Sequence, residues 1–299
     1  LSSIYCIMDY SIRYNENCVI IWIASYPKSG DTWVRAIISS LLYSNKNEVD
    51  INNLKIRQFP NRRDFKDIIT DFTNEEQFAK NCTYAQEKLN LDNKVKFFKT
   101  HNAYWKLGKY AFTDEKNSLG VIHVVRDPRN VITSLINHFN KTISNYEKAL
   151  NFLMDEKRMF GPEKLSLTEN DLPTIISSWS NHYNSWKKFK KNNLLIKYEN
   201  LLLNPDEEYL KIANFLKKML NFQFDASNIS EAISNTEFEK LKNQENIDGF
   251  IEAAKDKNKQ NLKFFHLGPQ NRWEDLLEDN IKNAIQDKFK DEMKELGYL

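Results

Sequence analysis

Four short apolar runs are spaced along the chain, and each one leads into polar residues. They cover residues 18–27, 94–101, 119–128 and 193–200. Short continuous runs of aliphatic and aromatic residues are typical of strands buried on both faces of a parallel sheet. Between them, apolar residues recur every three or four positions, which predicts amphipathic helices over 31–44, 173–190, 206–219 and 277–296. This alternation predicts an α/β fold with a parallel sheet flanked by helices on both faces.

The ends of the four runs predict where a ligand would bind. Ligands of such sheets bind beyond the carboxyl ends of the strands. All four runs end in chemically capable residues, namely Lys28-Ser29-Gly30, Lys99-Thr100-His101, Arg126-Asp127 and Tyr198-Glu199. The more polar regions 45–93, 140–172 and 220–268 are expected to be irregular excursions that cover this site.

Length, composition and charge predict the number of domains and exclude some classes of protein. The chain has 299 residues, 41% of them hydrophobic and 28% charged, which predicts a single domain over 1–299 with its core from about residue 18 and an N-terminal extension over 1–17. A net charge of +2 argues against a general nucleic-acid binder. No apolar run has the length of a membrane span, which is about 18 residues or more. Three cysteines without metal-ligand spacing indicate reduced thiols and a cytoplasmic protein.

The first strand-to-helix loop, "PKSGDTW", has the layout of a phosphate-binding loop. Backbone N–H groups at the helix start and the hydroxyls of Ser29 and Thr32 would form an anion cradle, and Lys28 adds a full charge. The nucleotide signature G-x-x-x-x-G-K-[ST] is absent, because Lys28 precedes Gly30. A turn capped by Ser29 or Asp31 is the purely structural alternative. The loop therefore predicts a P-loop-like sheet and raises the question of which phosphate-like group it holds.

The second strand ends in "FKTH", which carries a candidate general base. Lys99 and His101 leave the same face of the strand. A histidine beside a lysine suits a base next to a charge stabiliser, because the lysine would lower the histidine pKa and keep the ring neutral. A surface histidine beside a solvated lysine is the alternative.

The third strand ends in "RDPRNVITSL", which carries a candidate phosphate clamp. Arg126 stands at the strand tip, and Ser134 lies about two turns into the next helix. Arginine is suited to bidentate phosphate recognition. Asp127 and Pro128 form a helix start, and such a cap would position Arg126.

Taken in order, "SYPKSGDTW", "FKTH", "VVRDPRNVITS" and "IKYENLLLNP" resemble the cytosolic-type sulfotransferases. Members of that family transfer a sulfuryl group from 3′-phosphoadenosine 5′-phosphosulfate (PAPS) to a hydroxyl or amine of an acceptor and release PAP. The resemblance runs from about residue 18 to the C-terminus, where "RWEDLLEDN" is similar to the family's closing motif. The final "ELGYL" is more similar to bacterial members.

The resemblance implies a role for each matching residue. It places the 5′-phosphosulfate loop at Lys28, Ser29, Gly30, Asp31, Thr32 and Trp33. It places the 3′-phosphate contacts at Arg126, Ser134, His266, Leu267 and Gly268. It places further nucleotide contacts at Tyr198, Thr236 and Phe238. It makes His101 the catalytic base, and Lys99 its partner.

The implied reaction is an in-line transfer without a metal. His101 would remove the acceptor proton while Lys28 and Lys99 stabilise the developing charge. A sulfuryl group carries less negative charge than a phosphoryl group, so lysines can act in place of Mg²⁺. The acceptor is expected to be a small molecule, whose identity the sequence leaves open along with the oligomeric state.

Two positions depart from the family pattern. Asp31 stands where many members have threonine, and we expect it to point outward or to meet a cation. His266-Leu267 stands where many members have Arg-Lys, and Arg272 or Lys263 could compensate. Two other hypotheses therefore stay open: a P-loop kinase, which would need an acidic Mg²⁺ ligand at a strand end, and a catalytically weak PAP- or PAPS-binding relative.

The remaining aromatic and histidine positions receive simpler predictions. Tyr104 and Trp105 are weak candidates for the acceptor side. His138 either lines the acceptor pocket or lies on a helix surface. Core or structural positions are predicted for His123, His182, Trp179, Tyr183 and Trp186.

Overall fold

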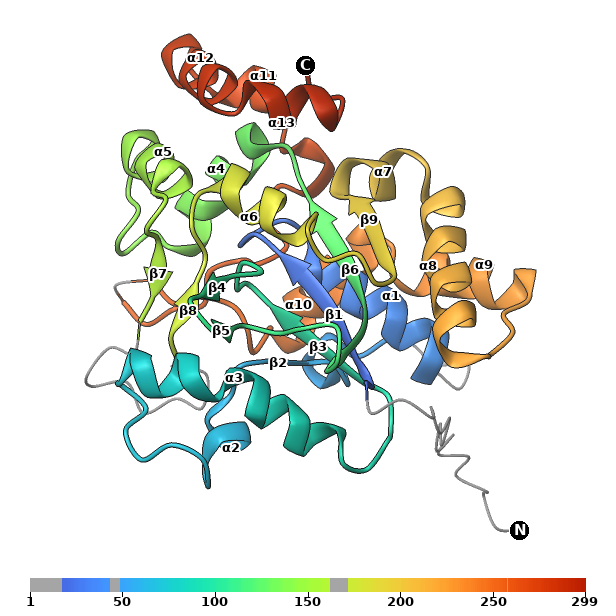
Figure 1. Cartoon of the computed structure of the whole chain (residues 1–299). Helices are drawn as coiled ribbons and strands as arrows, with labels where there is room; N and C mark the ends of the chain where they lie inside the picture. Colours follow the sequence, from blue (N-terminus) through green and yellow to red (C-terminus); the bar gives the residue numbers. More distant parts are fainter. Residues whose placement is uncertain (1–17, 44–48, 162–171, 257) are drawn as a thin grey trace.

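Five parallel strands form the central sheet, in the order β2-β3-β1-β6-β9 (Figure 1). The computed structural model describes residues 18–43, 49–161, 172–256 and 258–299. The strands are β1 (Ile20–Ser25), β2 (Arg57–Gln58), β3 (Lys96–Thr100), β6 (Ser118–Val125) and β9 (Asn193–Lys197). Four of them coincide with the predicted apolar runs, so the parallel α/β fold is confirmed. β2 was missed because two polar residues carry no strand pattern.

The central strand β1 packs against both layers of the core. Ile21 and Ile23 join the cluster formed with the first helix, α1 (Asp31–Tyr43). Ile20 and Trp22 belong to an aromatic cluster on the other face. Successive side chains of a strand point to opposite faces, so a strand covered on both sides must be apolar throughout. This explains why the run reads as continuously hydrophobic.

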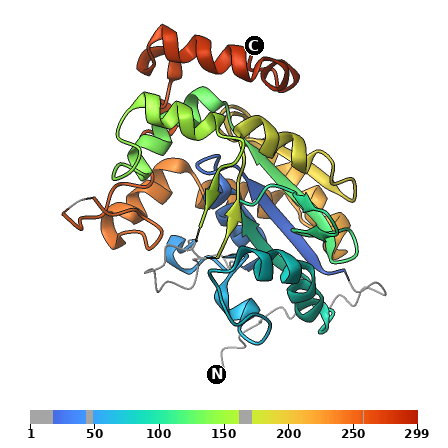
Figure 2. The same ribbon diagram turned by 60° about the vertical axis from the view of Figure 1, so that its left-hand side comes forward.

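Helices cover both faces of the sheet and its carboxyl end (Figures 1 and 2). α7 (Tyr198–Leu203), α8 (Pro205–Leu220), α9 (Ala226–Asn235) and α10 (Phe238–Asp248) contribute to the same cluster as α1. α2 (Arg62–Phe65) and α3 (Glu75–Asn90) contribute to the aromatic cluster. A third cluster joins α4 (Pro128–His138), α5 (Tyr146–Met154), α6 (Trp179–Trp186), α12 (Asp279–Lys288) and α13 (Lys290–Glu295). The short elements are η1 (Ile51–Asn53), β4 (Lys106–Leu107), β5 (Tyr110–Ala111), β7 (Met159–Phe160), β8 (Thr174–Ile175), η2 (Gly268–Gln270) and α11 (Trp273–Leu276).

The helix predictions were correct in type but differ at several boundaries. The segment 173–190 forms a helix only over α6, because the Ser178 hydroxyl caps it and the preceding residues form β8. The segment 277–296 is divided between α12 and α13 at Phe289. The regions expected to be irregular contain α2, α3, α5, α9 and α10. Polar caps such as Asn74 and Asn145 start helices there, although few apolar residues mark them.

Other sequence expectations concern single residues. Cys18 and Cys82 are buried and form no disulfide, whereas Cys6 and the predicted extension 1–17 lie outside the described residues. Trp179, Tyr183, Trp186, His123 and His182 are buried, as predicted. None of the helices that the described residues form has the length and apolar character needed to cross a bilayer.

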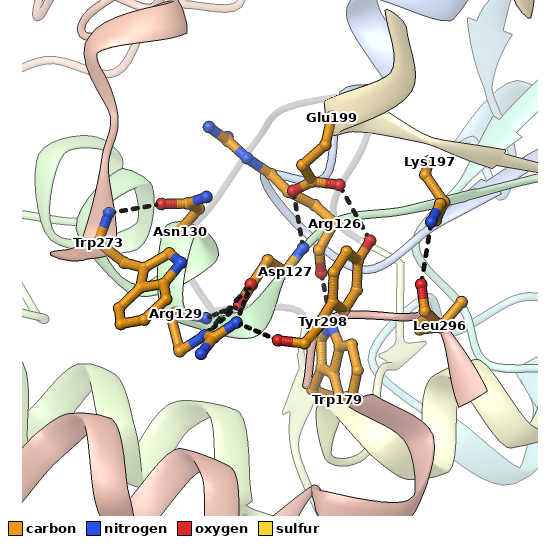
Figure 3. Close-up of polar contacts among 10 residues, drawn as sticks. All are labelled: Arg126, Asp127, Arg129, Asn130, Trp179, Lys197, Glu199, Trp273, Leu296 and Tyr298. Atoms are coloured by element: carbon orange, nitrogen blue, oxygen red, sulfur yellow. Dashed lines mark hydrogen bonds and ion pairs between the residues drawn. The ribbon is translucent and has the colours of Figure 1, made fainter. Parts of the chain in front are cut away.

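The C-terminal segment is bound to the strand ends by a buried polar network (Figure 3). Arg129 contacts the Asp127 carboxylate at 2.6 Å and donates to the Tyr298 carbonyl at 2.7 Å. Its guanidinium lies 3.7 Å from the centre of the Trp273 ring. Glu199 accepts from the Asp127 N–H at 2.9 Å and from the Tyr298 hydroxyl at 3.0 Å. The network therefore fixes the backbone directly after Arg126.

Arg129→Met should destabilise the fold strongly. Arg129 is 3% exposed, and its loss leaves the Asp127 carboxylate buried without its cation. Breaking a buried ion pair in this way costs about 3–5 kcal/mol, which urea unfolding followed by circular dichroism would measure. The matched control is Arg272→Met, because the Arg272–Asp275 pair has side chains that are 66% and 63% exposed. The control should lose less than about 1 kcal/mol, and equal losses in both variants would contradict the prediction.

Candidate functional site

Parallel register brings the strand ends together at one edge of the sheet. Ile23 pairs with Lys99, Ser25 with Val124, and Val125 with Lys197, so the residues that follow each strand converge. They line a cavity of about 800 Å³. Its lining includes fourteen of the predicted site residues: Lys28, Gly30, Asp31, Thr32, Trp33, Lys99, His101, Arg126, Ser134, Tyr198, Phe238, His266, Leu267 and Gly268. Ser29 and Thr236 do not line the cavity and are buried directly beside it.

The loop after β1 has a backbone that requires glycine at one position. Gly30 has a φ of 108°, and a Cβ built there would lie 2.6 Å from Cδ2 of Tyr198. Lys28 also has a positive φ, of 67°. The turn allows α1 to begin at Asp31, with the Val34 N–H donating to the Gly30 carbonyl at 3.2 Å. The free N–H groups of the first helical turn therefore lie beside the cavity.

Two buried donor groups of this loop region have no hydrogen-bond partner among the residues that the structure describes. The Ser29 hydroxyl and the Arg126 Nε are both buried without a hydrogen bond. Buried polar groups are normally hydrogen-bonded, so such a pair points to a missing partner. Arg126 is otherwise held by the Lys28 carbonyl and the Ser134 hydroxyl, each at 3.2 Å, and its guanidinium lies 4.0 Å from the centre of the Tyr198 ring. These donors fit an anionic group.

Lys28 is a partly buried amine in a cationic environment. Its Nζ lies 3.7 Å from the centre of the Phe264 ring. Burial is the largest cause that lowers the pKa of Lys28 to about 7; Lys99 and Arg126 act in the same direction, and Asp31 and Glu252 oppose them. The amine therefore loses part of its charge near neutral pH and would regain it beside an anion.

Two carboxylates hold Lys99. The Lys99 Nζ lies 3.3 Å from Glu252 Oε2 and 3.5 Å from Asp31 Oδ2. Burial alone would raise the pKa of Asp31, but Lys99, His101 and Arg35 outweigh it and hold that pKa well below its usual range. The prediction that Asp31 meets a cation is confirmed, and its side chain is buried rather than pointing outward.

Arg35 forms an ion pair with Glu252 and is itself hydrogen-bonded to the backbone. Its Nη1 donates to the two Glu252 oxygens at 2.8 and 3.1 Å, and its Nε donates to the Ile56 carbonyl at 2.9 Å. Burial opposes ionisation of Glu252, but Lys99 and Arg35 prevail and lower its pKa. Arg35 and Glu252 were missed from the sequence, because Arg35 lies within an apolar helix pattern and Glu252 lies 153 residues from Lys99.

The geometry of His101 leaves one ring nitrogen available. Its Nδ1 lies 2.9 Å from the Ser25 carbonyl and 3.2 Å from the Ser25 hydroxyl. A carbonyl oxygen can only accept, so Nδ1 carries the proton and Nε2 keeps its lone pair. Burial lowers the pKa of His101, and Lys99 and Lys28 contribute in the same direction against the opposing charge of Asp31. The ring is therefore neutral and can accept a proton.

Aromatic side chains form the other end of the cavity. The Trp33 Nε1 donates to the Thr236 carbonyl at 2.7 Å, and its ring meets Phe238 edge-on at 6.3 Å between centroids. Thr236 is buried behind Trp33, with its hydroxyl 2.6 Å from that of Tyr209. Gly268 has a φ of 53°, and a Cβ there would lie 2.1 Å from Phe238 Cε1. Glycine at this position lets the chain pass directly over the Phe238 ring.

Four further residues that the sequence suggested for the site lie outside the cavity lining. Tyr104 and Trp105 do not line the cavity: Trp105 is buried, and Tyr104 packs against Trp186. Their proposed acceptor role is therefore not supported. Lys263 and Arg272 do not line it either, since Lys263 contacts Asn246 and Arg272 contacts Asp275.

The positions of Asp127 and His138 bear on two questions that the sequence left open: the role of the strand-end carboxylate and the place of the second histidine. The Asp127 side chain caps α4 by accepting from the Arg129 N–H, as predicted. His138 lines the cavity, which decides between its two predicted positions. In the part of the chain that the structure describes, no group of three or more His, Cys, Asp or Glu residues could hold a metal ion.

Comparison with known proteins identifies the family. A family model described as the sulfotransferase domain matches residues 20–297. The chain belongs to the sulfotransferase family. The resemblance found in the sequence motifs is thus confirmed over almost the whole chain.

Curated relatives within the sulfotransferase family are distant. Sulfotransferase 1B1 of the dog, Canis lupus familiaris, is 29% identical over 229 residues, which cover 74% of this chain and 66% of that protein. The amine sulfotransferase of the rabbit, Oryctolagus cuniculus, is 22% identical over 293 residues, which cover 96% of this chain and 83% of the relative. The alignment with the dog protein thus spans about two thirds of its length.

Solved structures of sulfotransferase relatives share the fold. A mouse sulfotransferase complexed with PAP has a TM-score of 0.56 at 19% identity, covering 95% of this chain and 87% of that one. Retinol dehydratase in complex with androsterone and the inactive cofactor PAP has a TM-score of 0.60 at 18% identity, covering 96% of this chain and 84% of that one. At this level of identity the likeness shows the fold alone.

Lys28 should react with amine reagents at an unusually low pH. Trace acetylation followed by peptide mass spectrometry, repeated across a pH series, should give a titration midpoint near pH 7, because burial lowers the Lys28 pKa to about 7. Asp31→Asn should move the midpoint lower still, because the Asp31 charge raises the Lys28 pKa. A midpoint near the ordinary lysine value of 10.5 would show that the amine is solvated.

Proposed function

We propose that this chain transfers a sulfuryl group from PAPS to a hydroxyl or amine of a small-molecule acceptor. The observation that carries the proposal is the convergence of Arg126, Lys28 and a neutral His101 in one cavity, with the Ser29 hydroxyl buried beside it without a hydrogen bond among the described residues. The donors suit an anion, and the histidine suits a nucleophile that must lose a proton. Family membership and PAP-bound structural neighbours support the same donor.

The residues around the loop fit the donor nucleotide. Lys28, the Ser29 and Thr32 hydroxyls and the N–H groups of the first turn of α1 would bind the 5′-phosphosulfate. Arg126 and Ser134 would bind the 3′-phosphate, with Gly268 and its neighbours closing over it. Trp33 and Phe238 would lie against the adenine, and Tyr198 would pack beneath the loop. Bound PAPS supplies the sulfuryl group and leaves as PAP.

The catalytic roles follow from the geometry of His101 and the lysines. His101 Nε2 accepts the acceptor proton as the acceptor oxygen or nitrogen forms a bond to sulfur. The sulfur–oxygen bond to the phosphate breaks, and PAP keeps the electron pair. Lys28 and Lys99 stabilise the charge that develops on the bridging and sulfuryl oxygens, which is where fixed cations are most effective. Ser25 holds the ring of His101 in the required tautomer.

The departures from the family pattern do not favour an inactive relative. Asp31 is neutralised by Lys99 and therefore does not act as a free anion in the cradle. His266 lines the cavity beside Gly268 and supplies an imidazole where many members carry a guanidinium. We expect a weaker hold on the 3′-phosphate than two fixed cations would give, while Arg126 stays in place to bind it.

Thermal unfolding with PAP, and separately with ATP and Mg²⁺, tests the proposed donor. A ligand at one hundred times its Kd stabilises the native state by about 2.7 kcal/mol. We expect a shift with PAP in the presence of EDTA, and transfer of labelled sulfuryl from PAPS to an acceptor in a screen of phenols, alcohols and amines. A shift only with ATP and Mg²⁺ would favour a kinase instead, and PAP binding without any transfer would favour the weak relative.

Gly30→Ala should weaken donor binding. The new Cβ would lie 2.6 Å from Tyr198 at a φ of 108°, so the loop must move. Strain of this kind costs about 1–3 kcal/mol, which corresponds to roughly 5- to 150-fold in the Kd for PAP measured by calorimetry. Gly108→Ala is the matched control, because Gly108 also has a positive φ, of 61°, with nothing within 4 Å of its Cβ. The control should bind PAP as the wild type does; unchanged binding by Gly30→Ala would refute the loop assignment.

His101→Ala should lower the transfer rate by about 10²–10⁴-fold, the usual contribution of a general base. The Kd for PAP should change little, which separates catalysis from binding. In the wild type the acid limb of kcat/KM should lie below the ordinary histidine pKa of 6.5, because burial lowers the His101 pKa. A rate within threefold of the wild type in His101→Ala would remove His101 from the mechanism.

A further inference from the structure

A second histidine faces the same cavity and has no part in the proposed transfer. His138 is the last residue of α4 and lies one turn beyond Ser134, which contacts Arg126. It lines the cavity together with His101. The inference drawn from it rests on the proposed function and concerns the acceptor.

The contacts of His138 leave its ring nitrogens unpaired. The ring lies edge-on to Phe139 at 4.7 Å and to Phe264 at 6.0 Å between centroids. Phe264 is also the ring under Lys28 Nζ, so His138 and Lys28 share one aromatic neighbour. Among the described residues no side chain or backbone group forms a hydrogen bond with His138. The ring is partly exposed in the cavity, so its nitrogens are open to a hydrogen bond from a ligand.

The shared contact with Phe264 places His138 near Lys28, and burial keeps its ring neutral. Burial is the largest cause that lowers the pKa of His138 to about 3, with smaller contributions from Lys28, Lys99 and His101 against the opposing charge of Asp31. These are the charges around the proposed sulfuryl position rather than Arg126 at the 3′-phosphate. A neutral imidazole offers one N–H donor and one nitrogen acceptor. It therefore suits an uncharged polar group and not an anion.

We propose that His138 is a specificity-determining residue that hydrogen-bonds a second polar group of the acceptor, besides the nucleophile that receives the sulfuryl group. The surrounding lining includes the apolar side chains of Phe139, Phe160 and Leu172. The acceptor class that fits is a compact aromatic or alicyclic compound with an additional hydroxyl or carbonyl. A simple monohydroxy compound of the same shape leaves the imidazole unpaired.

Matched acceptors test the proposal. The probes are 2-naphthol and the dihydroxynaphthalenes that add one hydroxyl at different positions of the same ring system. With the wild type, at least one diol should exceed 2-naphthol by tenfold or more in kcat/KM, since sites built to hydrogen-bond a substrate group reject analogues that lack it. His138→Phe should bring this ratio close to one. It should lower kcat/KM for the diol, whereas kcat/KM for 2-naphthol should stay the same or rise. His138→Gln should restore part of it.

The controls separate this proposal from the proposed function. Asn137→Ala is the matched variant, because Asn137 also lines the cavity but its amide already donates to the Lys263 carbonyl at 2.8 Å. It should keep the preference for the diol. PAP binding is measured first for every variant, and its failure in the wild type would overturn the donor assignment itself. If PAP binds but the wild type sulfates no probe, or the ratio is the same in His138→Phe, the role of His138 is overturned.

Discussion

Several cations are buried at one edge of the sheet, and the arrangement of the cavity depends on how their charge is balanced. Lys28, Lys99, Arg35 and Arg126 all line it, and burying cations together is unfavourable without compensation. Asp31 and Glu252 neutralise Lys99 and Arg35. Lys28 and Arg126 have no carboxylate partner among the described ion pairs, and each lies against an aromatic ring instead. Lys28 and Arg126 thus carry charge without a carboxylate partner at the place where the anionic donor is proposed to bind, so the donor would complete the electrostatic balance there.

Site residues at strand ends could be predicted from the sequence, whereas site residues that only the tertiary fold brings in could not. Parallel strands align their carboxyl ends, so Lys28, His101, Arg126 and Tyr198 could be grouped from the ends of four apolar runs. Glu252 could not, since it lies in a polar segment with no periodic pattern and meets Lys99 only through the tertiary fold. The helices of the polar excursions were missed for a related reason. Asn and Asp caps start them, and their apolar faces are too narrow to stand out from the sequence.

Asp31 shows how a substitution that looks unfavourable can be accommodated. A carboxylate at the first residue of α1 would repel an anionic donor if it stood alone, although the helix dipole favours it. Here its nearest cation is Lys99, which is also held by Glu252, and Glu252 is held by Arg35. The chain of alternating charges links α1, β3 and the segment around residue 252. Changing any one of these charges would therefore alter the position of Lys99 as well as the local field.

The two ends of the cavity are built by different parts of the chain. The end assigned to the donor comes from strand-end loops whose geometry is fixed by close backbone contacts, such as Gly30 against Tyr198 and Gly268 against Phe238. The end assigned to the acceptor comes from the last turn of α4 and from β7, β8 and the segment near β2. The donor end can stay constant while the acceptor end changes. A neutral histidine at the boundary between them can therefore select the acceptor without disturbing the chemistry.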